Sequence, residues 1–122
     1  MRERLHESGE MYLKVIERLT RGKSTVQPIE IAEELGYVKS SVSRAIKLLR
    51  GKGLITVNET NGVSLTPSGR RRAEQLRHKY EVLRSLFVSI GAEERMAEEA
   101  ACKIEHCVTD ELCGLIALYT PE

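Results

Sequence analysis

The fold is decided by residues 28–66, which read PIEIAEELGYVKSSVSRAIKLLRGKGLITVNETNGVSLT. Pro28 suits the first position of a short helix, and Gly36 suits the position just beyond its end. The residues before it, 23–27, form a polar connector. Apolar side chains recur at helical spacing over residues 39–50, so a second helix is expected there. The stretch therefore predicts two consecutive helices joined by a tight turn.

The spacing of the apolar residues changes after the second helix. Residues 54–57 and 63–66 are rich in β-formers, and the pentapeptide between them ends in Asn61-Gly62, which predicts a β-hairpin. A further helix is expected over residues 8–21, ahead of the stretch quoted above. Helix, short helix, turn, helix and hairpin is the order of a winged helix-turn-helix. We therefore expect a mainly α fold that binds double-stranded DNA.

The second of the paired helices carries a polar face that is separate from its apolar stripe. The candidate DNA-contacting residues are Ser40, Ser41, Ser43, Arg44 and Lys47. All but one of them recur at i, i+3, i+4 and i+7, so they share one face. A guanidinium can grip guanine with two hydrogen bonds, which makes Arg44 the best candidate for base reading, whereas the serines and Lys47 suit phosphate contacts. The alternative is an ordinary solvated helix face.

Charge is divided unevenly along the chain of 122 residues. Residues 1–73 hold fourteen Lys and Arg against eight Asp and Glu, whereas residues 74–122 hold five against ten. A basic half beside an acidic half suggests a polyanion-binding module joined to a module of another kind. We therefore expect a DNA-binding domain over residues 1–73 and a second, helical domain over residues 74–122.

The composition favours a cytoplasmic protein. No apolar run approaches the length of a membrane span, and the charges scattered over residues 2–10 do not resemble a signal peptide, so no membrane partner is expected. The three cysteines are an odd number gathered near one end, which does not suggest a disulfide framework. We expect reduced thiols, and we interpret Cys107 and Cys113 as small core residues.

Three helices are expected in the second half, over residues 67–90, 93–107 and 109–119. The first of them carries an apolar seam for another helix, made of Leu76, Tyr80, Leu83, Phe87 and Ile90. In the next helix, Cys102, Glu105 and His106 stand at i, i+3 and i+4, which would bring a thiolate, a carboxylate and an imidazole within reach of one ion. Spacing alone leaves another interpretation open, namely a buried thiol, a solvated carboxylate and a histidine that caps the helix.

Several segments resemble the diphtheria-toxin-repressor family of iron- and manganese-dependent repressors. They read GEMYL over residues 9–13, IAEEL over 31–35, SVS over 41–43, LTPSGR over 65–70 and EAACKIEH over 99–106. These segments follow one another with family-like gaps through nearly the whole chain. The resemblance implies a winged helix-turn-helix followed by an α-helical dimerisation domain, and a homodimer that represses metal-homeostasis genes.

The resemblance also implies a metal site made of Met11, Cys102, Glu105 and His106. Because Met11 and Cys102 offer sulfur, iron(II) is the expected metal, and manganese(II) is the harder alternative. One ion would then join the two halves of the chain and set the spacing of two recognition helices in a dimer. Metal binding and operator binding would be coupled reciprocally.

The family's second metal site is not matched. Tyr80 and Arg84 stand where the family has a His and a Glu, and neither is a convincing ligand. One hypothesis is that the Arg84 guanidinium supplies the positive charge that an ion supplies in other members. The alternative is that Arg84 pairs with an exposed acid.

Three other functions compete with that of a metal-dependent repressor. In a metal-independent winged-helix regulator, the candidate ligands would be ordinary residues. An enzyme would use Cys102 and His106 as nucleophile and base, but the sequence offers no orienting third group and no glycine-rich loop nearby. An adaptor with a degenerate helix-turn-helix would have no need of a basic face at Arg44 and Lys47. We therefore expect neither enzymatic activity nor a small organic substrate.

Overall fold

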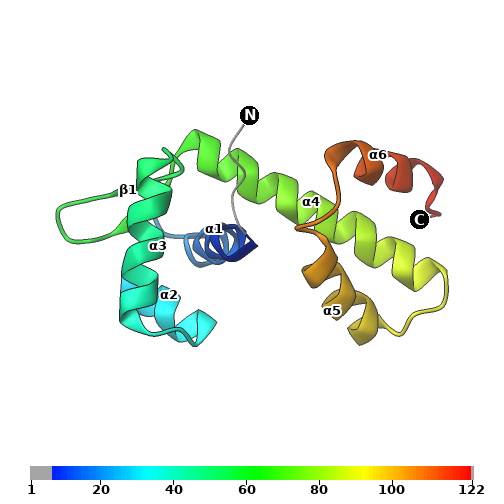
Figure 1. Ribbon diagram of the computed structural model, residues 1–122, viewed down its shortest axis with the longest axis horizontal. Helices are drawn as coiled ribbons and strands as arrows, with labels where there is room; N and C mark the ends of the chain where they lie inside the picture. The colour runs from blue at the N-terminus through cyan, green and yellow to red at the C-terminus, as the bar shows by residue number, and fades with distance from the viewer. Residues whose placement is uncertain (1–6, 122) are drawn as a thin grey trace. The chain divides into compact units, whose positions relative to one another are not determined.

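Figure 1 shows the computed structural model of the protein, which describes residues 7–121. Six helices and two strands lie in that range: α1 (Glu7–Leu19), α2 (Pro28–Leu35), α3 (Lys39–Gly51), β1 (Ile55–Val57), β2 (Val63–Leu65), α4 (Pro67–Ser89), α5 (Glu94–Ile104) and α6 (Asp110–Tyr119). The predicted mainly α class is confirmed. The chain forms two compact units that divide between Ala73 and Glu74. No helix in the described range is both long and apolar enough to cross a membrane.

The first unit contains a helix-turn-helix followed by a β-hairpin. α2 ends at Gly36, whose left-handed backbone (φ 70°) turns the chain while its N–H donates to the Ala32 carbonyl at 2.8 Å. α3 begins directly after the extended Val38. β1 and β2 then pair antiparallel, with Thr56 opposite Ser64. The predicted winged helix-turn-helix is confirmed.

One apolar core holds these elements together. Its fully buried members from α1, α2, α3 and both strands include Leu13, Ile16, Ile31, Val42, Leu49, Ile55 and Val63. Aliphatic side chains supply this volume, as a chain with one Phe and no Trp requires. Burying each of them contributes roughly 1.5–3 kcal/mol, so the core holds α3 firmly against the hairpin.

Val26, in the segment before α2, pairs with the hairpin through an isolated β-bridge to Val63. Val26 donates its N–H to the Val63 carbonyl at 2.9 Å and accepts the Val63 N–H at 2.8 Å. The sequence predicted only a polar connector over residues 23–27, and that prediction is wrong at the buried Val26. One apolar residue among polar neighbours has no periodicity from which a strand could be predicted.

The second unit packs α5, α6 and most of α4 around a smaller core. Its buried members and the side chains packed against them include Tyr80, Val82, Leu83, Phe87, Ala101, Val108, Cys113 and Ile116. Tyr80, Leu83 and Phe87 of the predicted α4 seam therefore meet this core. Ile90 does not take part, because α4 ends at Ser89 and the Ile90 side chain is exposed.

α5 ends earlier than the sequence predicted. The expected helix ran to residue 107, but α5 stops at Ile104, and the next three residues form a turn. The Cys107 N–H donates to the Ile104 carbonyl at 2.8 Å, a bond that spans three residues and tightens the backbone. Glu105 and His106 therefore lie on a turn after the helix and not on a helix face.

Candidate functional site

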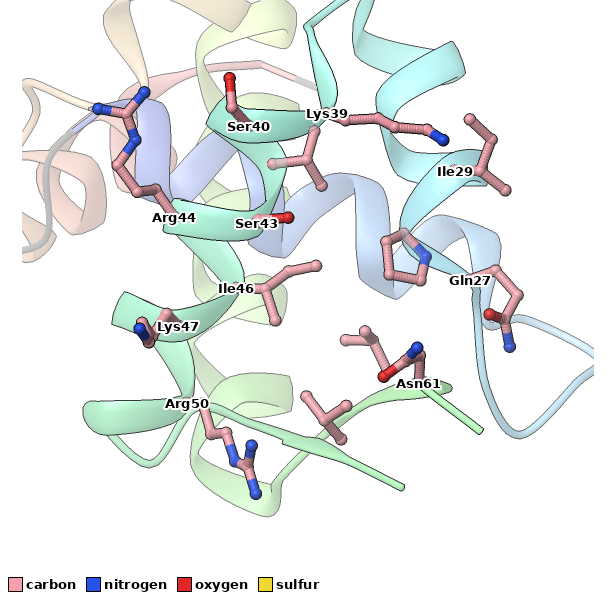
Figure 2. Close-up of a pocket in the computed structure, with 14 residues that line it drawn as sticks. Gln27, Ile29, Lys39, Ser40, Ser43, Arg44, Ile46, Lys47, Arg50 and Asn61 are labelled. Atoms are coloured by element: carbon pink, nitrogen blue, oxygen red, sulfur yellow. The ribbon is translucent and has the colours of Figure 1, made fainter. Parts of the chain in front are cut away.

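An open groove runs along α3 in the first unit, between the start of α2 and the hairpin (Figure 2). It has a volume of about 850 Å³. Eight of its lining residues come from α3: Lys39, Ser40, Val42, Ser43, Arg44, Ile46, Lys47 and Arg50. None of the described residues that line it is acidic, so the groove suits a polyanion.

Helical spacing places the polar side chains of α3 in this groove. Val42 and Leu49 are buried in the core, which turns the exposed Ser43, Arg44 and Lys47 outward. Figure 2 shows Ser40, Ser43, Arg44 and Lys47 on α3, with Ser43 pointing toward the start of α2 and Arg44 extending from the opposite edge of the helix. The structure thus brings together all of the predicted DNA-contacting residues except Ser41.

Ser41 is placed differently from the other serines. It is half-buried, it does not line the groove, and its N–H donates to the Val38 carbonyl at 3.1 Å in the first turn of α3. We retain it only as a candidate for a contact at the helix start.

The sequence interpretation missed four polar residues that line the groove. Lys39 and Arg50 lie at the two ends of α3, Gln27 precedes α2, and Asn61 belongs to the hairpin turn. The two basic residues were detectable, because Lys39 and Arg50 fall four before and seven after Ser43 and thus on the same helix face. Gln27 and Asn61 reach the groove only through the tertiary fold.

The tip of the wing, which is the hairpin formed by β1 and β2, is held by its own side chains. Asn58 Oδ1 accepts the N–H of Thr60 at 3.0 Å and the N–H of Gly62 at 2.7 Å. Asn61 adopts a left-handed backbone (φ 65°), which asparagine tolerates better than most residues. The Ser64 hydroxyl donates to the Ser24 carbonyl at 2.9 Å and fastens the wing to the segment before α2. A ligand in the groove therefore meets a preformed wing.

The candidate metal ligands of the second unit gather at the end of α5. Cys102 lies in the last turn of α5 and is half-buried, while Glu105 and His106 follow on the turn. The Glu105 and His106 side chains are 0% and 3% exposed, and Glu105 Oε2 lies 3.4 Å from His106 Nε2. Burying a carboxylate costs several kcal/mol unless positive charge or hydrogen bonds compensate it. Thiolate sulfur, carboxylate oxygen and imidazole nitrogen together suit a divalent transition metal.

The four predicted metal ligands are divided between the two units, with Met11 in the first and the other three in the second. Within residues 7–121, no three His, Cys, Asp or Glu side chains converge closely enough to hold an ion. The structure brings Glu105 and His106 together, leaves Cys102 one helical turn earlier, and places the half-buried Met11 on α1 of the first unit. The full ligand set stays a prediction.

Arg84 is engaged by acidic neighbours. Its guanidinium lies 3.6 Å from a Glu94 carboxylate oxygen and 3.9 Å from one of Glu81. These contacts favour the interpretation that Arg84 pairs with exposed acids over the hypothesis that its charge replaces that of a second metal ion. Burial raises the pKa of Tyr80, and the negative charge of Glu98 adds to that effect.

The two cysteines without a predicted ligand role have different surroundings. Cys113 is buried in the core of the second unit, as predicted, and burial raises the pKa of its thiol. Cys107 is exposed, so its interpretation as a core residue is wrong. The early end of α5 explains this, because Cys107 lies on the turn and not on an inward helix face. All three cysteines are free thiols.

Both units match known families. Residues 4–63 match the family described as iron dependent repressor, N-terminal DNA binding domain, and residues 66–119 match iron dependent repressor, metal binding and dimerisation domain.

Individual proteins resemble the chain over most of its length. The transcriptional regulator MntR of Escherichia coli is 27% identical over 109 residues, which are 89% of this chain and 70% of MntR. The diphtheria toxin repressor of Corynebacterium diphtheriae is 29% identical over 88% of this chain and 48% of its own length. A solved manganese-dependent transcriptional repressor in complex with manganese superimposes with a TM-score of 0.79 at 29% identity, over 90% of this chain and 51% of that one. The chain thus spans about half the length of two of these relatives.

Proposed function

This chain belongs to the iron-dependent repressor family, whose members are metal-dependent DNA-binding regulators of transcription, and we propose that iron(II) is its effector. We assign operator binding to residues 1–73, and metal binding and dimerisation to residues 74–122. The protein acts in the cytoplasm on metal-homeostasis genes, with no membrane partner, no small organic substrate and no enzymatic activity. The observation that carries the proposal is the groove along α3, none of whose described lining residues is acidic. The same chain also buries the carboxylate of Glu105 beside the imidazole of His106.

Operator binding uses the groove of the first unit. α3 enters the major groove of DNA, Arg44 reads a base edge, and Ser40, Ser43 and Lys47 bind phosphates. The exposure of these side chains and the absence of acids from the described groove lining support this assignment. The preformed wing lies beside α3 and is available to follow the DNA backbone.

The proposed metal ligands are Met11, Cys102, Glu105 and His106. A bound divalent ion supplies a positive charge and a coordination centre that these side chains share. Glu105 contributes an anionic oxygen that is already out of water, and His106 contributes a ring nitrogen beside it. The two sulfur donors favour iron(II) over manganese(II). Manganese(II) is the second candidate, because a solved relative is described as manganese-dependent.

Two copies of the chain form the active species. Several large apolar side chains of α6 are exposed by 48–81%, namely Leu112, Leu115, Leu118 and Tyr119. Such a surface is expected to be covered in solution, and the second unit matches a dimerisation domain. A dimer places two recognition helices on half-sites about one DNA turn apart.

The deciding experiment is anaerobic binding to DNA from upstream of the protein's own gene, at one fixed salt concentration. Iron(II), manganese(II) and a chelator are compared. We expect iron(II) to tighten binding at least tenfold, which corresponds to about 1.4 kcal/mol of coupling. Cys102→Ala should abolish this response, and Cys107→Ser, which changes an exposed thiol, should keep it. Equal binding with iron(II) and with chelator would identify a metal-independent winged-helix regulator instead.

A further inference from the structure

Lys79 reaches from α4 to the segment that joins α5 and α6. Its Nζ donates to the Val108 carbonyl at 2.7 Å and lies 3.1 Å from Asp110 Oδ1. The Lys79 side chain is only 17% exposed, whereas Asp110 is largely exposed. A mostly buried ammonium needs partners of this kind, because an unpaired one is costly to bury. The contact is therefore a fixed feature of the second unit.

The Val108 carbonyl lies two residues beyond His106. The turn between them is closed at its start by two backbone bonds, from the Glu105 N–H to the Ala101 carbonyl at 2.9 Å and from the Cys107 N–H to Ile104 at 2.8 Å. Both of these bonds tie the turn only to α5. Lys79 ties its far end to α4.

The far end of the turn is also where α6 begins. The Thr109 hydroxyl accepts the N–H of Leu112 at 3.1 Å and caps α6, and Asp110 stands in the first helical turn. By holding the Val108 carbonyl and the Asp110 carboxylate together, Lys79 fixes the path of the chain on both sides of Thr109. Loss of the ammonium would remove this polar restraint and leave the buried Val108 side chain as the remaining tie between the turn and the core.

We propose that Lys79 is a positioning residue for the metal site, because it fixes the turn that presents Glu105 and His106. This inference rests on the proposed function and assigns a role to a residue that binds no metal itself. Asp110, 3.1 Å from the Lys79 ammonium, partly neutralises its positive charge. Groups hydrogen-bonded directly to metal ligands typically change metal affinity 10–100-fold when they are removed, and Lys79, which acts through the backbone of the turn, is expected at the lower end of that range.

The test is an anaerobic titration of the full chain with cobalt(II), followed by its absorption bands. Lys79→Met keeps the length of the side chain and removes the ammonium, and we expect cobalt(II) to bind about tenfold more weakly. Lys79→Arg keeps a charged donor and should recover most of the affinity. Arg95→Met removes an equal charge from the exposed start of α5, about two helical turns before Cys102, and should change affinity by less than about twofold.

A second readout uses the metal-free protein. In Lys79→Met, hydrogen exchange at the Cys107 amide should accelerate at least about tenfold, while exchange at Ala97, whose N–H bonds to the Glu93 carbonyl near the start of α5, should stay as it was. A purely structural role would instead accelerate both amides. Asp110→Asn, which leaves the bond to Val108 in place, provides a milder variant should Lys79→Met fail to fold.

The outcomes separate the two proposals. If the wild-type chain binds cobalt(II) and Lys79→Met binds it equally well, or if exchange accelerates uniformly through the second unit, the role of Lys79 is overturned and the proposed function stands. If the wild-type chain binds no cobalt(II), the metal site itself is wrong and the inference fails with it.

Discussion

The rings of Tyr12 and Tyr37 meet edge to face, with their centroids 5.9 Å apart and their planes at 60°. Tyr12 belongs to α1 and is 4% exposed, whereas Tyr37 lies in the turn between α2 and α3. The contact therefore joins α1 to Tyr37, the residue directly before Val38, and Val38 is the N-cap of α3. Aromatic pairs of this geometry contribute about 0.5–1.5 kcal/mol beyond the area that they bury.

Removing the Tyr37 ring should therefore loosen the first unit. We expect Tyr37→Ala to lower the free energy of unfolding by about 1–2 kcal/mol, and Tyr37→Phe to keep most of it, because the ring contact survives. The neighbouring Val38 is 67% exposed, so Val38→Ala should change stability by no more than about 0.5 kcal/mol. Urea denaturation measures all three, and equal losses in Tyr37→Ala and Val38→Ala would show that the ring pair carries no stability.

The same pair predicts how stability depends on alkaline pH. Burial raises the pKa of Tyr12, and the nearby Tyr37 adds to that effect. Because the folded-state pKa lies above the unfolded value of about 10, this stabilisation is complete below pH 10 and is lost as pH rises through the folded pKa. Tyr12→Phe should make the decline of stability above pH 10 shallower. Tyr119→Phe, with an 81% exposed ring, should leave the decline as steep as in the wild type.

The start of α4 depends on one glycine. A Cβ at Gly69 would lie 1.9 Å from the Leu54 carbonyl oxygen, too close for any side chain. That oxygen also accepts the Thr66 N–H at 3.1 Å, so it cannot move away without breaking the bond between the residue before β1 and the residue before α4. We expect Gly69→Ala to destabilise the first unit by about 3 kcal/mol.

Gly51 gives the matched comparison for Gly69. It ends α3, and a Cβ there would meet no atom within 4 Å. Gly51→Ala should therefore be neutral or stabilising by up to about 1 kcal/mol, because alanine restricts the unfolded chain. Thermal unfolding distinguishes the two, and a Gly69→Ala protein as stable as Gly51→Ala would mean that the helix start is misplaced.

Local patterns were sufficient to predict the first unit. Helical spacing within α3 separates its buried residues from Arg44 and Lys47, and the turn-forming Asn61-Gly62 marks the hairpin, so both elements follow from the sequence. Pairing of Val26 with Val63 did not follow, because it joins residues far apart in the chain. For the same reason, Gln27 and Asn61 were not predicted to line the groove.

The end of α5 shows where sequence reasoning fails in the second unit. A period of 3.6 residues continues through Glu105 and His106, and only tertiary contacts such as the bond from Lys79 to Val108 indicate that the chain turns there. An apolar pattern does not encode tertiary contacts of this kind. Glu105 and His106 were first suggested by their spacing from Cys102, and family resemblance then favoured the metal interpretation. Their burial next to each other agrees with that choice without testing it.

Arg44 and Lys47 both line the acid-free groove, but their contributions to DNA binding should differ. If Arg44 reads a base, Arg44→Ala costs about 1–3 kcal/mol on the operator and much less on unrelated DNA, so that sequence preference is relaxed. If Lys47 binds a phosphate, Lys47→Ala weakens binding to every sequence alike and lowers the salt slope by about one. Arg18→Ala removes an equal charge from α1, where Arg18 pairs with Glu34, and should alter neither quantity. Equal losses on operator and unrelated DNA in Arg44→Ala would move Arg44 to the backbone contacts and leave base reading to another side chain of α3.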